Sequence, residues 1–128
     1  MRQVNYCLDK TEVGYAAAQQ AAHLLKEAIA QKGIATFVAA TGASQFEFLD
    51  FLTQMRDVDW SRTTMFHLDE YVGLSEEHPA SFRHYLKERL IEKVHPGQVY
   101  LIKGDAPDPY QECQRLGRLI SGVEVDVA

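Results

Sequence analysis

The sequence predicts an α/β fold, a three-layer α/β/α sandwich around a mainly parallel, Rossmann-like sheet. Segments with the patterns of strands and of helices alternate along the chain, as they do in proteins built from β-α-β units. Two strand segments, 34–40 and 64–68, are largely apolar instead of alternating, which is typical of strands covered on both faces. The chain has 128 residues, of which 46% are hydrophobic, so it forms one domain, or part of one, with a buried core.

The first part of the chain predicts a strand, a long helix and a second strand. Apolar and polar residues alternate over 4–8, which is the pattern of a half-buried strand. Asp9 or Thr11 can cap a helix that runs to about Lys32, where Gly33 is a natural stop. The predicted apolar stripe of this helix consists of Val13, Ala17, Ala21, Leu24, Leu25 and Ala28.

The remaining elements continue the alternation. They are a strand over 34–40, a helix over 46–55, a strand over 64–68, a helix that Ser81 caps and that holds Phe82, Tyr85, Leu86 and Leu90, a short strand over 99–101, a helix from Pro109 through about Ile120, and a strand over 123–128. Crossovers between parallel strands should be right-handed. Because the last predicted strand runs to the final residue, we expect the chain to be truncated at its C-terminus.

Composition excludes several classes of protein. The net charge of −5 argues against a nucleic-acid partner, since phosphate backbones are bound by basic surfaces. No apolar run is long enough to cross a bilayer, and the N-terminus lacks a signal-peptide core. Cys7 and Cys113 lie far apart, and no His/Asp/Glu cluster has the spacing of metal ligands. We therefore expect a cytoplasmic protein with no metal and no membrane partner.

The turn Thr41-Gly42-Ala43-Ser44 is the first candidate site. It follows a buried strand and precedes a helix, and ligands of parallel α/β sheets bind at the carboxyl ends of strands. Backbone N–H groups at the helix start, with the hydroxyls of Thr41 and Ser44, could hold a phosphate. In the simpler interpretation, Ser44 caps the helix and Gly42 only makes the turn.

The pair Asp69-Glu70, at the exit of the strand over 64–68, is the second candidate site. Neighbouring side chains of an extended segment point in opposite directions, so we expect one carboxylate to face the cleft and the other to make structural bonds. A carboxylate in a partly dry cleft is a candidate general base, although an isolated acidic pair is more often a solvated turn. His67 lies inside the strand and is expected to be a core histidine, and His78-Pro79 is expected to order a loop.

Two segments near this pair resemble a known family. Phe66–Leu74 (FHLDEYVGL) and His78–Phe82 (HPASF) resemble the signature of glucosamine-6-phosphate deaminases, which are also called glucosamine-6-phosphate isomerases. Gly104–Asp108 and Glu112-Cys113 are similar to another segment of that family. The resemblance spans essentially the whole chain and implies that residues 1–128 are the N-terminal part of a single sugar-phosphate isomerase/deaminase domain.

The resemblance implies an activity and a set of site residues. The family converts glucosamine 6-phosphate and water to fructose 6-phosphate and ammonium, on a Rossmann-like fold without a nucleotide cofactor. It implies that Asp69 moves a proton between C2 and C1 of the sugar, and that Thr41, Gly42, Ala43 and Ser44 hold the substrate phosphate. Glu70 and Tyr71 match positions that shape the substrate-binding site. The implied partner is a small sugar phosphate, and a homo-oligomer is compatible with the sequence.

The sequence also departs from the family pattern. The family turn has a second glycine, then threonine and a proline-containing helix start, where this chain has Ala43, Ser44 and Gln45-Phe46. A methyl group at position 43 narrows the turn. The resemblance places the histidine that assists ring opening, its acidic partners, the lid and the basic phosphate ligands after the final strand, outside these residues.

Three other interpretations remain open. A 6-phosphogluconolactonase has a related fold, but its loop looks more like a DER motif, and Tyr71 and His78-Pro79 argue against it. A non-catalytic sugar-phosphate-binding domain would need the phosphate turn but not Asp69. An inert structural fragment is compatible with a parent protein that is an enzyme.

Overall fold

A parallel sheet forms the centre of the molecule. The computed structural model describes residues 2–128. Three strands, β1 (Ala35–Ala39), β2 (Thr63–His67) and β3 (Gln98–Tyr100), pair in the order β1-β2-β3, and both pairings are parallel. Every residue of β2 is buried. The predicted parallel α/β fold is therefore confirmed, and the two apolar segments are its central strands.

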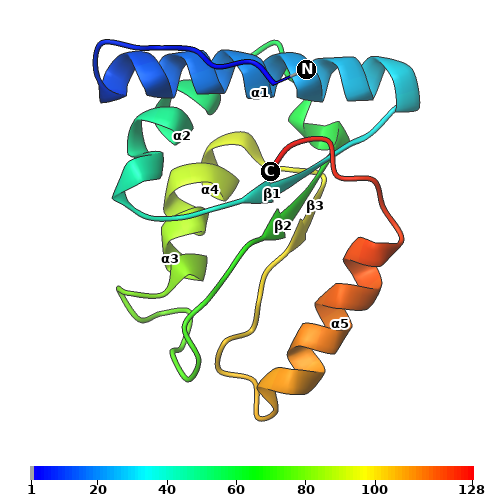
Figure 1. Cartoon of the computed structure of the whole chain (residues 1–128). Coiled ribbons are helices and arrows are strands. Elements are labelled where there is room, and N and C mark those ends of the chain that lie inside the picture. Colours follow the sequence, from blue (N-terminus) through cyan, green and yellow to red (C-terminus); the bar gives the residue numbers. More distant parts are fainter. Residues whose placement is uncertain (1) are drawn as a thin grey trace.

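Helices pack on both sides of this sheet. They are α1 (Lys10–Lys32), α2 (Phe46–Leu52), α3 (Phe82–Leu86), α4 (Glu92–Val94) and α5 (Pro109–Ser121), with 3-10 turns at Ala43–Gln45 (η1) and Trp60–Arg62 (η2) and a π-helical turn at Lys87–Ile91 (η3). In Figure 1, α2, α3 and α4 lie on one side of the sheet and α5 lies on the other. This arrangement gives the three layers that the alternation of elements predicts.

One hydrophobic cluster joins the sheet to α1, α2 and α3. Phe37 of β1 and Met65 of β2 are neighbours in register and belong to the same cluster as Leu25 of α1 and Leu86 of α3. Trp60 adds an edge-to-face contact with Phe37 at 6.0 Å between ring centres. Burial of these side chains fixes the strand ends, and therefore the loops that follow them.

The buried face of α1 differs from the predicted stripe. Val13 is 53% exposed, whereas the buried residues include Gly14 and Ala18. A Cβ at Gly14 would lie 2.6 Å from Cβ of Glu47, so α1 and α2 approach too closely there for a side chain. Small residues permit this close approach. The interface between α1 and α2 is therefore formed by small residues of α1 instead of larger apolar ones.

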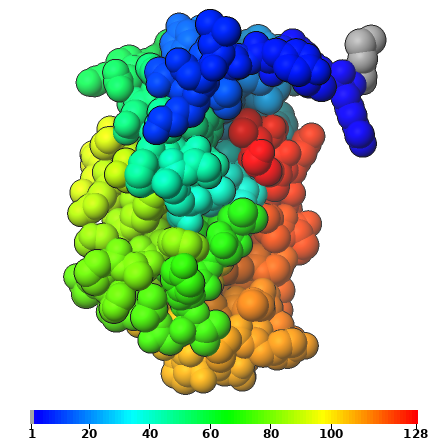
Figure 2. Space-filling view, turned by 60° about the vertical axis from the view of Figure 1, so that its left-hand side comes forward, coloured from blue at the N-terminus to red at the C-terminus, as the bar shows by residue number. Residues whose placement is uncertain are grey.

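The predicted strand over residues 4–8 is not present. Val4, Tyr6 and Leu8 are 71%, 94% and 95% exposed, and no backbone pairing joins this segment to the sheet within residues 2–128. The N–H of Leu8 instead donates to the Glu12 carboxylate at 2.6 Å. Figure 2 shows the segment running along the surface. An alternating pattern indicates strand propensity, but a strand also needs a partner edge.

The helix ends follow the predicted signals in most places. Asp9 caps α1 by accepting from the N–H of Glu12 at 2.9 Å, and Gly33 ends it with φ 81°. Asp108 caps α5, and Pro109 opens its first turn. The helix predicted over 46–55 is shorter and ends at Leu52.

The C-terminal residues lie beside β1 on the edge away from β2. Only Val127 pairs, as a parallel bridge to Phe37, with the N–H of Val38 donating to the Val127 carbonyl at 2.9 Å. The predicted strand over 123–128 is thus reduced to one bridge. The spatial order is β3, β2, β1 and then Val127, so the direction of strand order reverses next to β1. No helix within residues 2–128 is long and apolar enough to cross a membrane.

Candidate functional site

The carboxyl ends of β1 and β2 bring the two candidate segments together. Ala39 and His67 are partners in register at the ends of the two strands, and the N–H of Leu68 donates to the Ala39 carbonyl at 3.1 Å. The turn over 41–44 and the loop that begins at Asp69 therefore leave the same edge of the sheet. The reversal of strand order beside β1 lies at this edge too, and such switch points are where doubly wound sheets bind ligands.

The turn after β1 presents unused hydrogen-bond donors. Gly42 has φ 104° and ψ 171°, a conformation accessible essentially only to glycine, and its Cα faces open space. Among residues 2–128, the N–H groups of Ala43 and Ser44 and the hydroxyls of Thr41 and Ser44 have no hydrogen-bond partner. The interpretation of Ser44 as a helix cap is therefore wrong, since its side chain makes no capping bond.

Glu70 is the structural member of the acidic pair. Its side chain is fully buried, and its carboxylate accepts from the Ser81 hydroxyl at 2.8 Å and from the N–H groups of Phe82 and Arg83, each at 2.9 Å. Burial by itself would raise the pKa of Glu70, but these bonds and the one from the N–H of Tyr71 outweigh it and lower the pKa to about 2. Glu70 is consequently an anion that caps the first turn of α3.

The capping of α3 differs from the prediction. Ser81 occupies the position before the helix but makes no capping bond with its side chain. Its hydroxyl donates to Glu70, and the carboxylate of Glu70 satisfies the free N–H groups instead. A partner so distant in sequence leaves no local signal, so the capping of α3 could not be read from the segment around Ser81.

Arg83 closes the loop between β2 and α3, although no motif in the sequence marks it as a site residue. The guanidinium, only 5% exposed, lies 3.2 Å from the Glu70 carboxylate and 3.0 Å from that of Asp105. It also donates to the Leu74 carbonyl at 2.8 Å. The N–H of Gly73 bonds the Gly104 carbonyl at 2.7 Å, so the loop after β3 is fastened to the same structure. A buried ion pair therefore fixes the strand exit that carries Asp69.

Asp69 takes no part in this network. The residue is exposed, and its carboxylate forms no hydrogen bond or ion pair in the described part of the chain. The expectation that one carboxylate of the pair makes structural bonds is confirmed for Glu70, and the expectation that Asp69 faces a ligand cleft stays a prediction. Tyr71 is half exposed, and its ring contacts Phe82 at 4.8 Å between centres. The predicted roles of Asp69, Glu70 and Tyr71 toward a substrate stay predictions.

The two nearby histidines serve the framework. His67 is buried, and its Nδ1 accepts from the N–H of Ile102 at 3.3 Å. Burial lowers the pKa of His67, which favours the neutral ring of a core histidine. The Nδ1 of His78 accepts from the N–H of Ala80 at 3.0 Å, so this residue orders its loop. No group of three His, Cys, Asp or Glu side chains within residues 2–128 could hold a metal.

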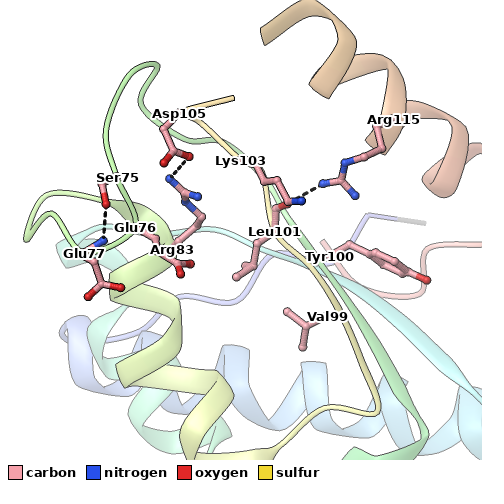
Figure 3. Close-up of a pocket in the computed structure, with 10 residues that line it drawn as sticks. All are labelled: Ser75, Glu76, Glu77, Arg83, Val99, Tyr100, Leu101, Lys103, Asp105 and Arg115. Atoms are coloured by element: carbon pink, nitrogen blue, oxygen red, sulfur yellow. Dashed lines mark hydrogen bonds and ion pairs between the residues drawn. The ribbon is translucent and has the colours of Figure 1, made fainter. Parts of the chain in front are cut away.

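A cavity of about 540 Å³ lies beside β3 (Figure 3). One of its lining residues, Arg83, is bonded to Glu70. Its lining includes the side chains of Arg83, Lys103, Asp105 and Arg115. Figure 3 shows Arg83 and Asp105 paired on one wall, with Arg115 projecting from α5 on another. Neither the turn over 41–44 nor Asp69 lines it. The candidate site is instead an open edge of the sheet.

The fold is that of an α/β protein with a parallel, Rossmann-like sheet, and the candidate site lies at its strand ends. Comparison with known proteins makes the class specific. The family model described as glucosamine-6-phosphate isomerases/6-phosphogluconolactonase matches residues 8–126. The chain therefore belongs to the family of glucosamine-6-phosphate isomerases and 6-phosphogluconolactonases.

Individual relatives agree with this membership. A glucosamine-6-phosphate deaminase of Exiguobacterium sp. is 38% identical over 104 residues, which are 81% of this chain and 41% of that protein. A glucosamine-6-phosphate deaminase of Streptococcus sanguinis is 37% identical, over 84% of this chain and 45% of the relative. The chain thus spans less than half the length of these relatives.

Solved structures show the same fold. A monomeric glucosamine-6-phosphate deaminase superposes with a TM-score of 0.82 at 27% identity, over 91% of this chain and 48% of that one. A 6-phosphogluconolactonase from Shewanella baltica superposes with a TM-score of 0.78 at 19% identity, over 91% of this chain and 49% of that one. The second likeness concerns the fold alone.

Proposed function

We propose that this chain is the N-terminal part of the single domain of a glucosamine-6-phosphate deaminase. The reaction converts glucosamine 6-phosphate and water to fructose 6-phosphate and ammonium. The observation that carries the proposal is the exposed, unbonded carboxylate of Asp69 beside a turn with free N–H groups at Ala43 and Ser44. A base and an anion site at one sheet edge suit a phosphorylated sugar whose reacting carbons lie at the other end of the molecule.

Asp69 is the proposed base. Its carboxylate removes the proton from C2 of the open-chain amino sugar while O1 gains a proton, which forms an enolamine. The same carboxylic acid then protonates C1, water adds to the resulting C2 iminium ion, and ammonium leaves. Glu70 supports this role by fixing the strand exit, since its own carboxylate is occupied by five hydrogen bonds to Ser81, Phe82, Arg83 and Tyr71.

The turn Thr41-Gly42-Ala43-Ser44 is the proposed phosphate site. Backbone N–H groups and hydroxyls supply the donors, and the open side of Gly42 leaves room for close approach. Because the chain spans less than half of its relatives' length, we propose that the remaining catalytic groups come from sequence that these 128 residues do not cover. Turnover by this chain alone is not expected. The proposed setting is the cytoplasm, and oligomerisation is not required, since one structural relative is described as monomeric.

The test is ammonium release by the full-length protein that contains these residues. Replacement of Asp69 by Asn keeps the shape but removes the base, and should lower kcat at least about 100-fold. Asp57→Asn is the matched control, since Asp57 is an exposed aspartate paired with Lys26 outside the site, and it should leave kcat unchanged. Normal turnover by the Asp69→Asn protein would refute the assignment of the base. Lactone hydrolysis without ammonium release would identify a 6-phosphogluconolactonase instead.

A further inference from the structure

The phosphate turn is bonded to a side chain from a different helix. The hydroxyl of Tyr85, in α3, donates to the carbonyl of Gly42 at 2.8 Å. The same carbonyl accepts from the N–H of Gln45 at 3.0 Å, so two donors define the direction in which it points. Burial raises the pKa of the Tyr85 phenol, which keeps the proton that the bond needs.

This bond sets the direction of the next amide. The peptide bonds of residues 2–128 are all trans, and in a trans peptide the C=O and the following N–H point in opposite directions. Holding the Gly42 carbonyl toward Tyr85 therefore turns the N–H of Ala43 the other way, and that N–H is one of the unused donors of the turn. Glycine at position 42 has little intrinsic preference for one orientation, so an external bond is needed to select it.

The position of Tyr85 is itself fixed by packing. Its ring stacks on Phe46, the first residue of α2, with 5.9 Å between centres and 19° between planes. The guanidinium of Arg89 covers the Phe46 ring at 3.7 Å from its centre. Arg89 belongs to the π-helical turn Lys87–Ile91, a rare geometry that often occurs near functional sites. The stack joins the start of α2 to α3 and leaves the Tyr85 hydroxyl directed at the turn.

We propose that Tyr85 is a positioning residue for the substrate phosphate, acting through the Gly42–Ala43 peptide. The inference rests on the proposed function of the turn as a phosphate site. Tyr85 itself does not contact the substrate. Its bond keeps the turn in the arrangement that binds phosphate before any ligand arrives, so that binding requires no reorientation of the peptide.

The test is a titration of the full-length protein that contains these residues, observed through the amide NMR signals of Ala43 and Ser44. Inorganic phosphate and glucosamine 6-phosphate should shift both signals, and unphosphorylated glucosamine should not. Tyr85→Phe keeps the stacked ring and removes only the hydroxyl, and it should raise the Kd for both phosphate ligands about five-fold, the loss expected for one hydrogen bond. Tyr110→Phe removes the hydroxyl of an exposed tyrosine in α5 and should leave both Kd values unchanged.

The outcomes separate this inference from the proposed function. Absence of phosphate binding by the unmodified protein would overturn the phosphate site of the proposed function, and with it the role of Tyr85. Phosphate binding with an equal Kd in the Tyr85→Phe protein would overturn the role of Tyr85 alone. A merely structural role predicts a lower thermal midpoint with an unchanged Kd, so both are measured on each variant. The ammonium assay with Asp69→Asn reports separately on the reaction. Weakened phosphate binding in Tyr85→Phe therefore supports the positioning role whichever reaction the protein catalyses.

Discussion

The two segments at the candidate site are built in opposite ways. The loop after β2 has its main polar groups already occupied, because the buried Glu70 carboxylate and the Arg83 guanidinium bond within the loop, to the adjoining helix and to Asp105 of the loop after β3. The turn after β1 has free N–H donors at Ala43 and Ser44. Within residues 2–128, its backbone is bonded by a side chain from outside the turn at the Gly42 carbonyl, which accepts from the Tyr85 hydroxyl. The first segment supplies stability to the sheet edge, and the second is available to a ligand.

The comparison predicts that substitutions in the loop after β2 act mainly on stability. Glu70→Gln retains the shape but removes the buried carboxylate partner of Arg83 and leaves the guanidinium with the half-exposed Asp105. Breaking a buried ion pair in this way costs about 3 to 5 kcal/mol. We expect a loss of this size in the free energy of unfolding, measured by urea denaturation. Glu77→Gln, at an exposed position of the same loop, is the control and should change it by less than about 0.5 kcal/mol. A loss below about 1 kcal/mol for Glu70→Gln would mean that the loop is not held by this ion pair.

Because of the same carboxylate, we expect the free energy of unfolding to fall at acid pH. The pKa of Glu70 in the folded protein is about 2, against an ordinary value of 4.5, so the folded state binds this proton less readily than the unfolded chain. The stabilisation is complete above about pH 4.5 and is lost as the pH falls toward 2, with a total of about 3 kcal/mol from the linkage relation. Urea denaturation between pH 6 and 2.5 measures it. In Glu70→Gln, the part of the pH dependence of the free energy of unfolding that comes from Glu70 should disappear. An unchanged pH dependence would mean that other groups cause the loss of stability at acid pH.

Glu112 is a second source of such a pH dependence and must be separated from Glu70. Its side chain is 7% exposed and pairs with Arg115 at 2.6 Å. The bond from Arg115 outweighs burial and lowers the pKa of Glu112 to about 2. In a Glu70→Gln, Glu112→Gln double variant, the free energy of unfolding should therefore depend less on pH in the acid range than in either single variant. The two carboxylates share no hydrogen bond, so we expect their effects to add, apart from any coupling through the loop after β3, in which the N–H of Lys103 bonds Glu112 and Asp105 pairs with Arg83.

The parts that the sequence predicted correctly are those whose causes are local. The buried strands follow from apolar runs, Asp9 caps its own helix, and Gly33 ends it with a left-handed conformation. The strand predicted over 4–8 was wrong because alternation cannot reveal whether a partner edge exists. The Ser81 cap was wrong because the carboxylate that replaces it comes from Glu70, 11 positions earlier at the exit of β2.

The same distinction applies to the site. The two-residue period of an extended chain, which is a local property, predicted that one member of the Asp69-Glu70 pair makes structural bonds, and Glu70 makes them. Arg83 and Tyr85 were not predicted, because the contact of Tyr85 with Gly42 spans 43 positions and depends on how α3 packs beside α2. Residues that position a site from another helix leave no pattern in the segment that they serve.

The smallest expected effects on the free energy of unfolding come from alanine substitutions at two glycines, Gly42 and Gly117, which have different backbone conformations. A Cβ at either Gly42 or Gly117 would have no neighbour within 4 Å, so neither Gly→Ala change creates a clash. Gly42 has φ 104°, where alanine is strained, and Gly42→Ala should lower the free energy of unfolding by about 1 to 3 kcal/mol and abolish the phosphate shifts at Ala43 and Ser44.

Gly117 lies within helix α5, where alanine is favoured by about 1 kcal/mol over glycine. Gly117→Ala should therefore raise the free energy of unfolding by about that amount and leave phosphate binding unchanged. Urea denaturation and the NMR titration are measured on both variants. Equal effects of the two substitutions on stability would show that the turn after β1 relaxes to an ordinary conformation, and the orientation of the Gly42–Ala43 peptide would then not be what prepares this segment for an anion.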